Sequence, residues 1–168
     1  HWTRDGQNRI EAVAAEHGYT PVYLRYNSGR SISTNGREFA EQMETLLRHW
    51  PHPVQEVAIV GHSMGGLVAR SAVHHGRAAR HDWPRSLRRL LFLGTPHHGA
   101  PLERGGHRLD YVMELSPYVA PFTRLGKSRS AGITDLRYGS ITDYEQAYVP
   151  LPHDVAHYAL APPLGKRR

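Results

Sequence analysis

A serine between two glycines is the residue in this chain whose surroundings most favour chemistry. The stretch VAIVGHSMGGLVAR covers residues 57–70, and its GHSMG segment at 61–65 fits the pattern G-x-S-x-G. In that pattern the serine occupies a sharp strand-to-helix turn, which lifts its hydroxyl clear of the sheet. Flanking glycines let the two backbones pass closely, and the helix N-terminus lies beneath the nucleophile. The spacing predicts Ser63 as the nucleophile and the backbone N–H of Met64 as an oxyanion donor.

The residues around this turn predict the elements that hold it. An apolar strand is expected over residues 54–60, buried on both faces, and a helix from about residue 65 to 76. Gly66, Ala69 and Ala72 keep that helix slim where it crosses the sheet. The alternative is an ordinary glycine-rich turn with no catalytic role.

The remaining pattern alternates helices and strands. Helices are expected at 8–18 and 37–50, the second with a capping box of Asn35 and Glu38, and strands at 20–26, 87–94 and 155–161. This order predicts one α/β domain with a mostly parallel sheet and helices on both faces. Residues 95–152 read as a possible insertion or lid within it. The aromatic residues expected in the core are Tyr23, Tyr26, Phe39, Trp50 and Phe92.

Two motifs together resemble a known family. GHSMGGLVAR at 61–70 and LGTPHHGAP at 93–101 are similar to the α/β-hydrolase lipases and esterases. More narrowly they resemble the GPI inositol-deacylase-like group and its bacterial relatives, as do the stretches at 18–44 and 125–140. The resemblance implies an α/β-hydrolase fold, a serine nucleophile matched by Ser63, an oxyanion donor matched by Met64, an Asp acid, a His base and ester substrates.

The acid, the base and a second oxyanion donor are not matched. In this fold the acid and then the histidine follow the serine, and by the resemblance both are expected beyond Arg168. The internal alternatives are Asp135, Asp143 or Asp154 with His157, and Asp135 or Asp143 with His153. His98-Gly99 is a weak candidate for the second donor loop, against a purely structural loop.

Composition excludes several other chemistries. The chain has no cysteine, so disulfides and thiolate sites are absent, and its 13 histidines form no metal-binding spacing. No metal or organic cofactor is expected. A net charge of +6 reads mainly as a solvated basic surface, with contact to an anionic membrane surface as the alternative. Nucleic-acid binding is not expected.

The sequence thus predicts a serine carboxylic-ester hydrolase that acts on an ester or lipid substrate. The alternative is a truncated, non-catalytic remnant of such a hydrolase that lacks the acid and the base. No signal peptide or membrane-spanning run is expected in this chain, and a cytoplasmic location is slightly favoured.

Overall fold

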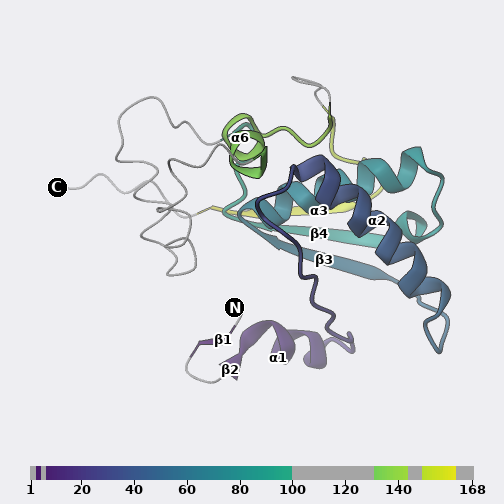
Figure 1. Cartoon of the computed structure of the whole chain (residues 1–168). Helices are drawn as coiled ribbons and strands as arrows, with labels where there is room; N and C mark the ends of the chain where they lie inside the picture. The colour runs from purple at the N-terminus through teal and green to yellow at the C-terminus, as the bar shows by residue number, and fades with distance from the viewer. Residues whose placement is uncertain (1–2, 5–6, 100–130, 144–148, 162–168) are drawn as a thin grey trace.

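The computed structural model describes residues 3–4, 7–99, 131–143 and 149–161. A small antiparallel pair and a short helix come first, and a three-stranded sheet with its helices follows (Figure 1). The elements are β1 (Thr3–Arg4), β2 (Gln7–Asn8), α1 (Arg9–Glu16), α2 (Ile32–Arg48), β3 (Val57–His62), α3 (Met64–Ala78), the 3₁₀ turn η1 (Trp83–Arg85), β4 (Leu87–Leu93), α6 (Ala131–Tyr138) and β5 (Ala156–Leu160).

The main sheet is parallel, with the order β3-β4-β5. Its register pairs His62 at the end of β3 with Leu93, and Leu93 with Leu160 at the end of β5. Because the strands run the same way, their carboxyl ends meet at one edge. The loop that follows Leu93 therefore emerges beside the turn that follows His62.

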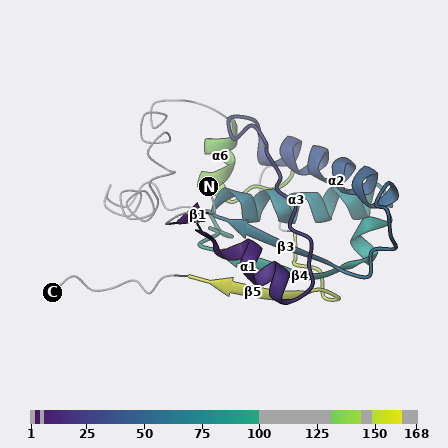
Figure 2. The ribbon, with the colours of Figure 1, turned by 90° about the horizontal axis from the view of Figure 1, so that it is seen from below.

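Helices α2 and α3 cover one side of this sheet, while α1 lies on the other side (Figures 1 and 2). Leu90 and Phe92 of β4 are buried in one core cluster with Val73 of α3. A second cluster, nearer the carboxyl edge, joins Met64 and Leu67 of α3 to other apolar residues. Parallel strands connected through helices confirm the predicted α/β class.

The prediction of a strand at residues 20–26 is wrong. These residues form no strand in the structure. Pro21 has no backbone N–H to donate to a ladder, and side chains fix the segment instead. Tyr19 hydrogen-bonds to Glu56 and accepts a bond from Arg89, with 2.7 Å between the Arg89 nitrogen and the Tyr19 hydroxyl.

The expected start of the second helix is also wrong. Helix α2 begins at Ile32, and Ser31 caps it by accepting a hydrogen bond from the Thr34 N–H at 3.1 Å. Asn35 therefore lies inside the helix, where it is 2% exposed. Ser31 is the cap because its side-chain oxygen accepts from a first-turn N–H, whereas the Asn35 amide donates to the carbonyls of Asn27 and Arg30.

Burial corrects two further expectations, and helix α1 has no buried residue. Asn8 caps α1, and Gly18 follows it at a φ of +72°. Residues 57–60 of β3 are half-buried, so the strand is not covered on both faces. Among the aromatic residues expected in the core, Phe92 is buried, but Tyr23 and Tyr26 are 44% and 36% exposed.

The expected insertion or lid at 95–152 lies largely outside the described residues, and helix α6 is one part of it that is described. Its Gly132 packs directly on the backbone carbonyls of Ser28 and Arg30. Asp135 accepts a hydrogen bond from the Ile32 N–H at 2.7 Å, which adds a second cap to α2. Helix α6 thus docks on the loop that precedes α2.

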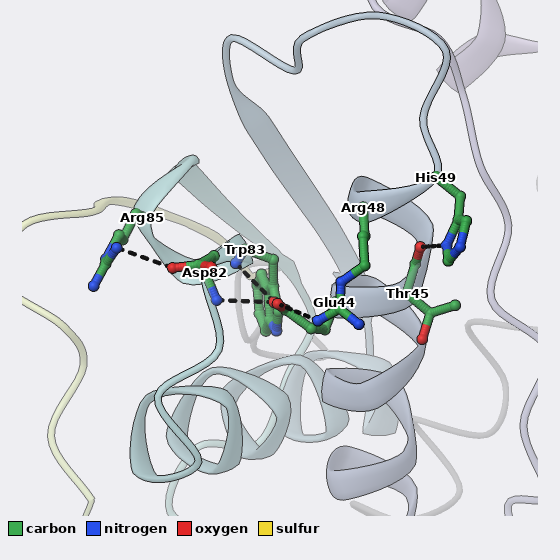
Figure 3. Close-up of polar contacts among 7 residues, drawn as sticks. All are labelled: Glu44, Thr45, Arg48, His49, Asp82, Trp83 and Arg85. Carbon is green, nitrogen blue, oxygen red and sulfur yellow. Dashed lines mark hydrogen bonds and ion pairs between the residues drawn. The ribbon is translucent and has the colours of Figure 1, made fainter.

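A cluster of polar side chains lies near the amino ends of the strands (Figure 3). Glu44 of α2 accepts hydrogen bonds from the backbone N–H groups of Asp82 and Trp83 at 2.8 and 3.1 Å, and Arg48 lies 3.2 Å from it. A cavity of about 250 Å³ is lined by Glu44, Arg48 and Trp83, among others. It lies at the opposite end of the sheet from Ser63.

Candidate active site

Ser63 occupies the turn between β3 and α3 with strained backbone angles. Its φ of 51° and ψ of −124° lie in a region that residues other than glycine rarely adopt. Its backbone N–H donates to the Leu93 carbonyl at 2.9 Å, so the β3–β4 ladder continues into the turn. Ser63 is the N-cap of α3, yet its side chain makes no capping hydrogen bond. The hydroxyl is therefore not used to close the helix.

Close contact between two glycines makes this turn possible. A Cβ on Gly61 would lie 2.5 Å from the Gly66 Cα, and Gly66 is itself covered by the Thr95 side chain. A Cβ on Gly65 would meet its nearest atom, the Tyr26 hydroxyl, only at 3.8 Å. The steric need therefore falls on Gly61 and Gly66, whereas the generic motif names Gly61 and Gly65.

The N-terminus of α3 begins directly after the serine. Met64 is the first helical residue, and its side chain is buried in the second core cluster. Backbone N–H groups in the first turn of a helix lack acceptors within the helix and carry the positive end of its dipole. The Met64 N–H lies in this position, beside the serine that precedes it.

The loop after β4 lies against the same turn. Thr95 packs on Gly66, and its hydroxyl oxygen is buried with no hydrogen-bond partner among the described residues. The Gly99 N–H donates within the loop to the Pro96 carbonyl at 3.1 Å. Gly139, just after α6, packs closely on that N–H. This geometry favours a structural role for His98-Gly99 over the role of an oxyanion donor.

A histidine in this loop is held by an arginine of α3. Arg70 lies 3.2 Å from the Nδ1 atom of His97, and since arginine only donates, that nitrogen is the acceptor. Burial, helped by the Arg70 charge, lowers the pKa of His97 to about 4. His97 is therefore neutral at physiological pH and is engaged by Arg70.

The internal acid candidates are all engaged elsewhere. Asp143 forms an ion pair with Arg37 at 2.6 Å, and Asp154 forms one with Arg77 at 2.7 Å. Asp135 caps α2 as described above. His157 of β5 has a buried Nε2 atom without a hydrogen-bond partner in the described part of the chain, and burial lowers its pKa. His153 is exposed.

In residues 3–4, 7–99, 131–143 and 149–161, no three His, Asp or Glu side chains gather in a way that would hold a metal ion. Within the same residues, no helix has the length and apolar character needed to cross a membrane.

Three features define an α/β-hydrolase-like domain. They are the parallel sheet, the strained serine between a strand and a helix, and the close contact of Gly61 with Gly66 where the strand meets the helix. The chain belongs to the family described as the PGAP1-like alpha/beta domain, whose model matches residues 11–155. This membership agrees with the resemblance found in the motifs around Ser63. A search of curated proteins found no match.

The sequence predicts Tyr26 in the core, but in the structure this residue lies near the serine turn. Its hydroxyl lies beside Gly65 in the first turn of α3. One available signal was its position at the end of the expected strand 20–26. The carboxyl ends of strands in an open α/β sheet face the ligand site.

Proposed function

We propose that this domain is a serine carboxylic-ester hydrolase with Ser63 as its nucleophile. The observation that carries the proposal is the strained backbone of Ser63, combined with a hydroxyl that makes no capping bond. Strain of this kind costs about 1–3 kcal/mol and is retained where a site needs it. A nucleophile at the end of a strand is one such need.

The proposed reaction is a two-step acyl transfer. The Ser63 Oγ attacks the ester carbonyl while its proton passes to a histidine base, and the Met64 N–H stabilises the charge that develops on oxygen. The alcohol leaves with that proton, and water then releases the carboxylic acid from the acyl-serine. The histidine and the acid that orients it are not assigned to residues of this chain.

The substrate is proposed to be an ester, with a lipid ester as the favoured class. The net charge of +6 suits a peripheral contact with an anionic lipid surface. Neither a metal nor an organic cofactor takes part in this scheme, because the nucleophile, base and oxyanion donors supply the chemistry. No nucleic-acid partner is proposed.

Hydrolysis of short and long acyl esters tests this function. The complete reading frame that contains this chain, and the chain itself, are compared with their Ser63→Ala variants. Loss of the nucleophile is expected to lower kcat by about 10⁴-fold or more. Equal rates in parent and variant would contradict the proposal.

A non-catalytic remnant is the second candidate. It is favoured by the ion pairs that hold Asp143 and Asp154 away from a catalytic pairing with histidine. If the complete reading frame hydrolyses esters through Ser63 but residues 1–168 alone do not, residues 1–168 are a non-catalytic remnant.

A further inference from the structure

The hydroxyl of Tyr26 lies at the N-terminus of α3, close to the turn that carries Ser63. It is the nearest atom to the Cβ position of Gly65, at 3.8 Å, and Gly65 is only two residues beyond the serine. The tyrosine as a whole is 36% exposed, and its hydroxyl lies against the end of the helix. A ligand reaching Ser63 over the helix N-terminus would approach this hydroxyl.

The chain on both sides of Tyr26 is fixed. Leu24 packs against the second core cluster, which includes Met64 and Leu67. On the other side, the Asn27 carbonyl accepts a hydrogen bond from the Asn35 side chain at 2.9 Å. Since Asn35 is 2% exposed, this anchor is internal. The position of the tyrosine is therefore set by the fold and not by a free loop.

The Tyr26 hydroxyl can also donate a hydrogen bond to a ligand. It forms no hydrogen bond with another described residue, whereas Tyr23 bonds to Glu11 at 2.8 Å and Tyr19 bonds to Glu56. Removal of surrounding water raises the pKa of Tyr26 above its ordinary value of 10.0. The phenol is thus a neutral donor at any pH at which an esterase works.

We propose that Tyr26 is a second oxyanion donor, which hydrogen-bonds through its hydroxyl to the carbonyl oxygen of an acyl group under attack by Ser63. This inference rests on the proposed function. The Met64 N–H and the Tyr26 hydroxyl would bind the same oxygen from two elements. The tyrosine keeps its proton throughout, so no proton or electron is transferred by it. Its role is to stabilise negative charge that exists only in the transition state and the intermediate.

Tyr26→Phe tests the donor, because it removes one oxygen atom and keeps the ring. The matched control is Tyr23→Phe, which removes the same atom from an exposed tyrosine of the same segment. Both variants and Ser63→Ala are made in the complete reading frame and assayed with p-nitrophenyl esters and with the matching thionoesters. Circular dichroism and thermal unfolding check that each variant remains folded.

The expected result is a kcat about 100-fold lower in Tyr26→Phe, with KM within twofold, and no change in Tyr23→Phe. The preference for the oxygen ester over the thionoester should shrink in Tyr26→Phe, because sulfur is a weaker acceptor than oxygen. Hydrolysis that depends on Ser63 but not on Tyr26, or a change in KM alone, would overturn the Tyr26 proposal and leave the proposed function standing. Hydrolysis that does not depend on Ser63 would overturn both.

Discussion

At the scale of single residues, the turn at Ser63 depends on which glycines touch. Gly61 faces Gly66 across the turn, while a Cβ on Gly65 would make only an ordinary contact, 3.8 Å from the Tyr26 hydroxyl. The motif G-x-S-x-G gives the positions of the glycines relative to the serine, but it does not show where the backbones of the strand and the helix come into contact. The structure therefore separates two glycines that the pattern treats alike.

Gly61→Ala and Gly65→Ala are predicted to differ sharply in stability. A Cβ at 2.5 Å from the Gly66 Cα forces two backbones apart, so Gly61→Ala should lower the free energy of unfolding by about 2 kcal/mol or more. Gly65→Ala should be neutral or slightly stabilising, because alanine favours a helix by about 1 kcal/mol over glycine. Urea unfolding measures both. Equal losses of stability in the two variants would contradict a close contact between Gly61 and Gly66.

The turn at Ser63 can be predicted from the sequence, whereas the residues that pack around it cannot. The apolar strand before the serine and the small-residue helix after it are local patterns, so the turn between them is predictable. The positions of Tyr26 and Thr95 are not, because each depends on how a distant segment folds against α3. The engagement of Asp143 by Arg37 joins residues 106 positions apart and has no local signal.

At the scale of elements, Glu44 links α2 to the turn that starts β4. Its carboxylate accepts from two backbone N–H groups and pairs with Arg48 (Figure 3). Burial opposes its ionisation, but the bonds from Trp83, Asp82 and Arg48 outweigh it and hold the pKa of Glu44 below its ordinary value. The ionised carboxylate is therefore the form that stabilises the fold.

Glu44→Gln is predicted to destabilise the protein at neutral pH by about 1 kcal/mol, because a charged acceptor is replaced by a neutral one. Since the folded-state pKa is lowered, the contribution of Glu44 is full above the unfolded pKa and is lost as pH falls through the folded pKa. The gap between parent and variant should therefore close in acid. Unfolding curves from pH 7 down to pH 3 measure it, with the exposed Glu41→Gln as control. A gap that stays constant with pH would rule out this role.

Element prediction failed where long-range contacts overrode a local pattern. Residues 20–26 alternate like a strand, but Pro21 and the side-chain anchors at Tyr19 and Leu24 place them without a ladder. Helix α2 starts earlier than the sequence predicts, because Ile32 is buried by packing that has no local signal. The strands expected at 87–94 and 155–161 are present as β4 and β5, because short runs rich in apolar residues are a local signal.

At the scale of the whole molecule, the two faces of the sheet are covered unequally: α2 and α3 pack on one face, whereas α1, on the other side, has no buried residue. Leu90 and Phe92 point toward the helices and are buried. On the opposite face of β5, Tyr158 and Leu160 are 51% and 63% exposed. Within the described residues, β5 pairs only with β4. An apolar edge strand of this kind favours association between molecules.

Residues 1–168 are predicted to self-associate as their concentration rises. Tyr158→Lys combined with Leu160→Lys should reduce this association, because charge at an edge strand opposes pairing. Tyr138→Lys is the matched control, since Tyr138 is 66% exposed on α6 and away from the sheet edge. Sedimentation velocity over a range of concentrations measures the effect. A parent that stays monomeric throughout would contradict the prediction.

The most direct test of the account is covalent labelling of Ser63. A fluorophosphonate is incubated with the complete reading frame, and the modified residue is located by mass spectrometry of its peptides. One adduct is expected, on the Ser63 hydroxyl. It should be absent from Ser63→Ala and from heat-denatured protein. No adduct, or equal labelling of the parent and Ser63→Ala, would contradict the assignment of Ser63 as the nucleophile.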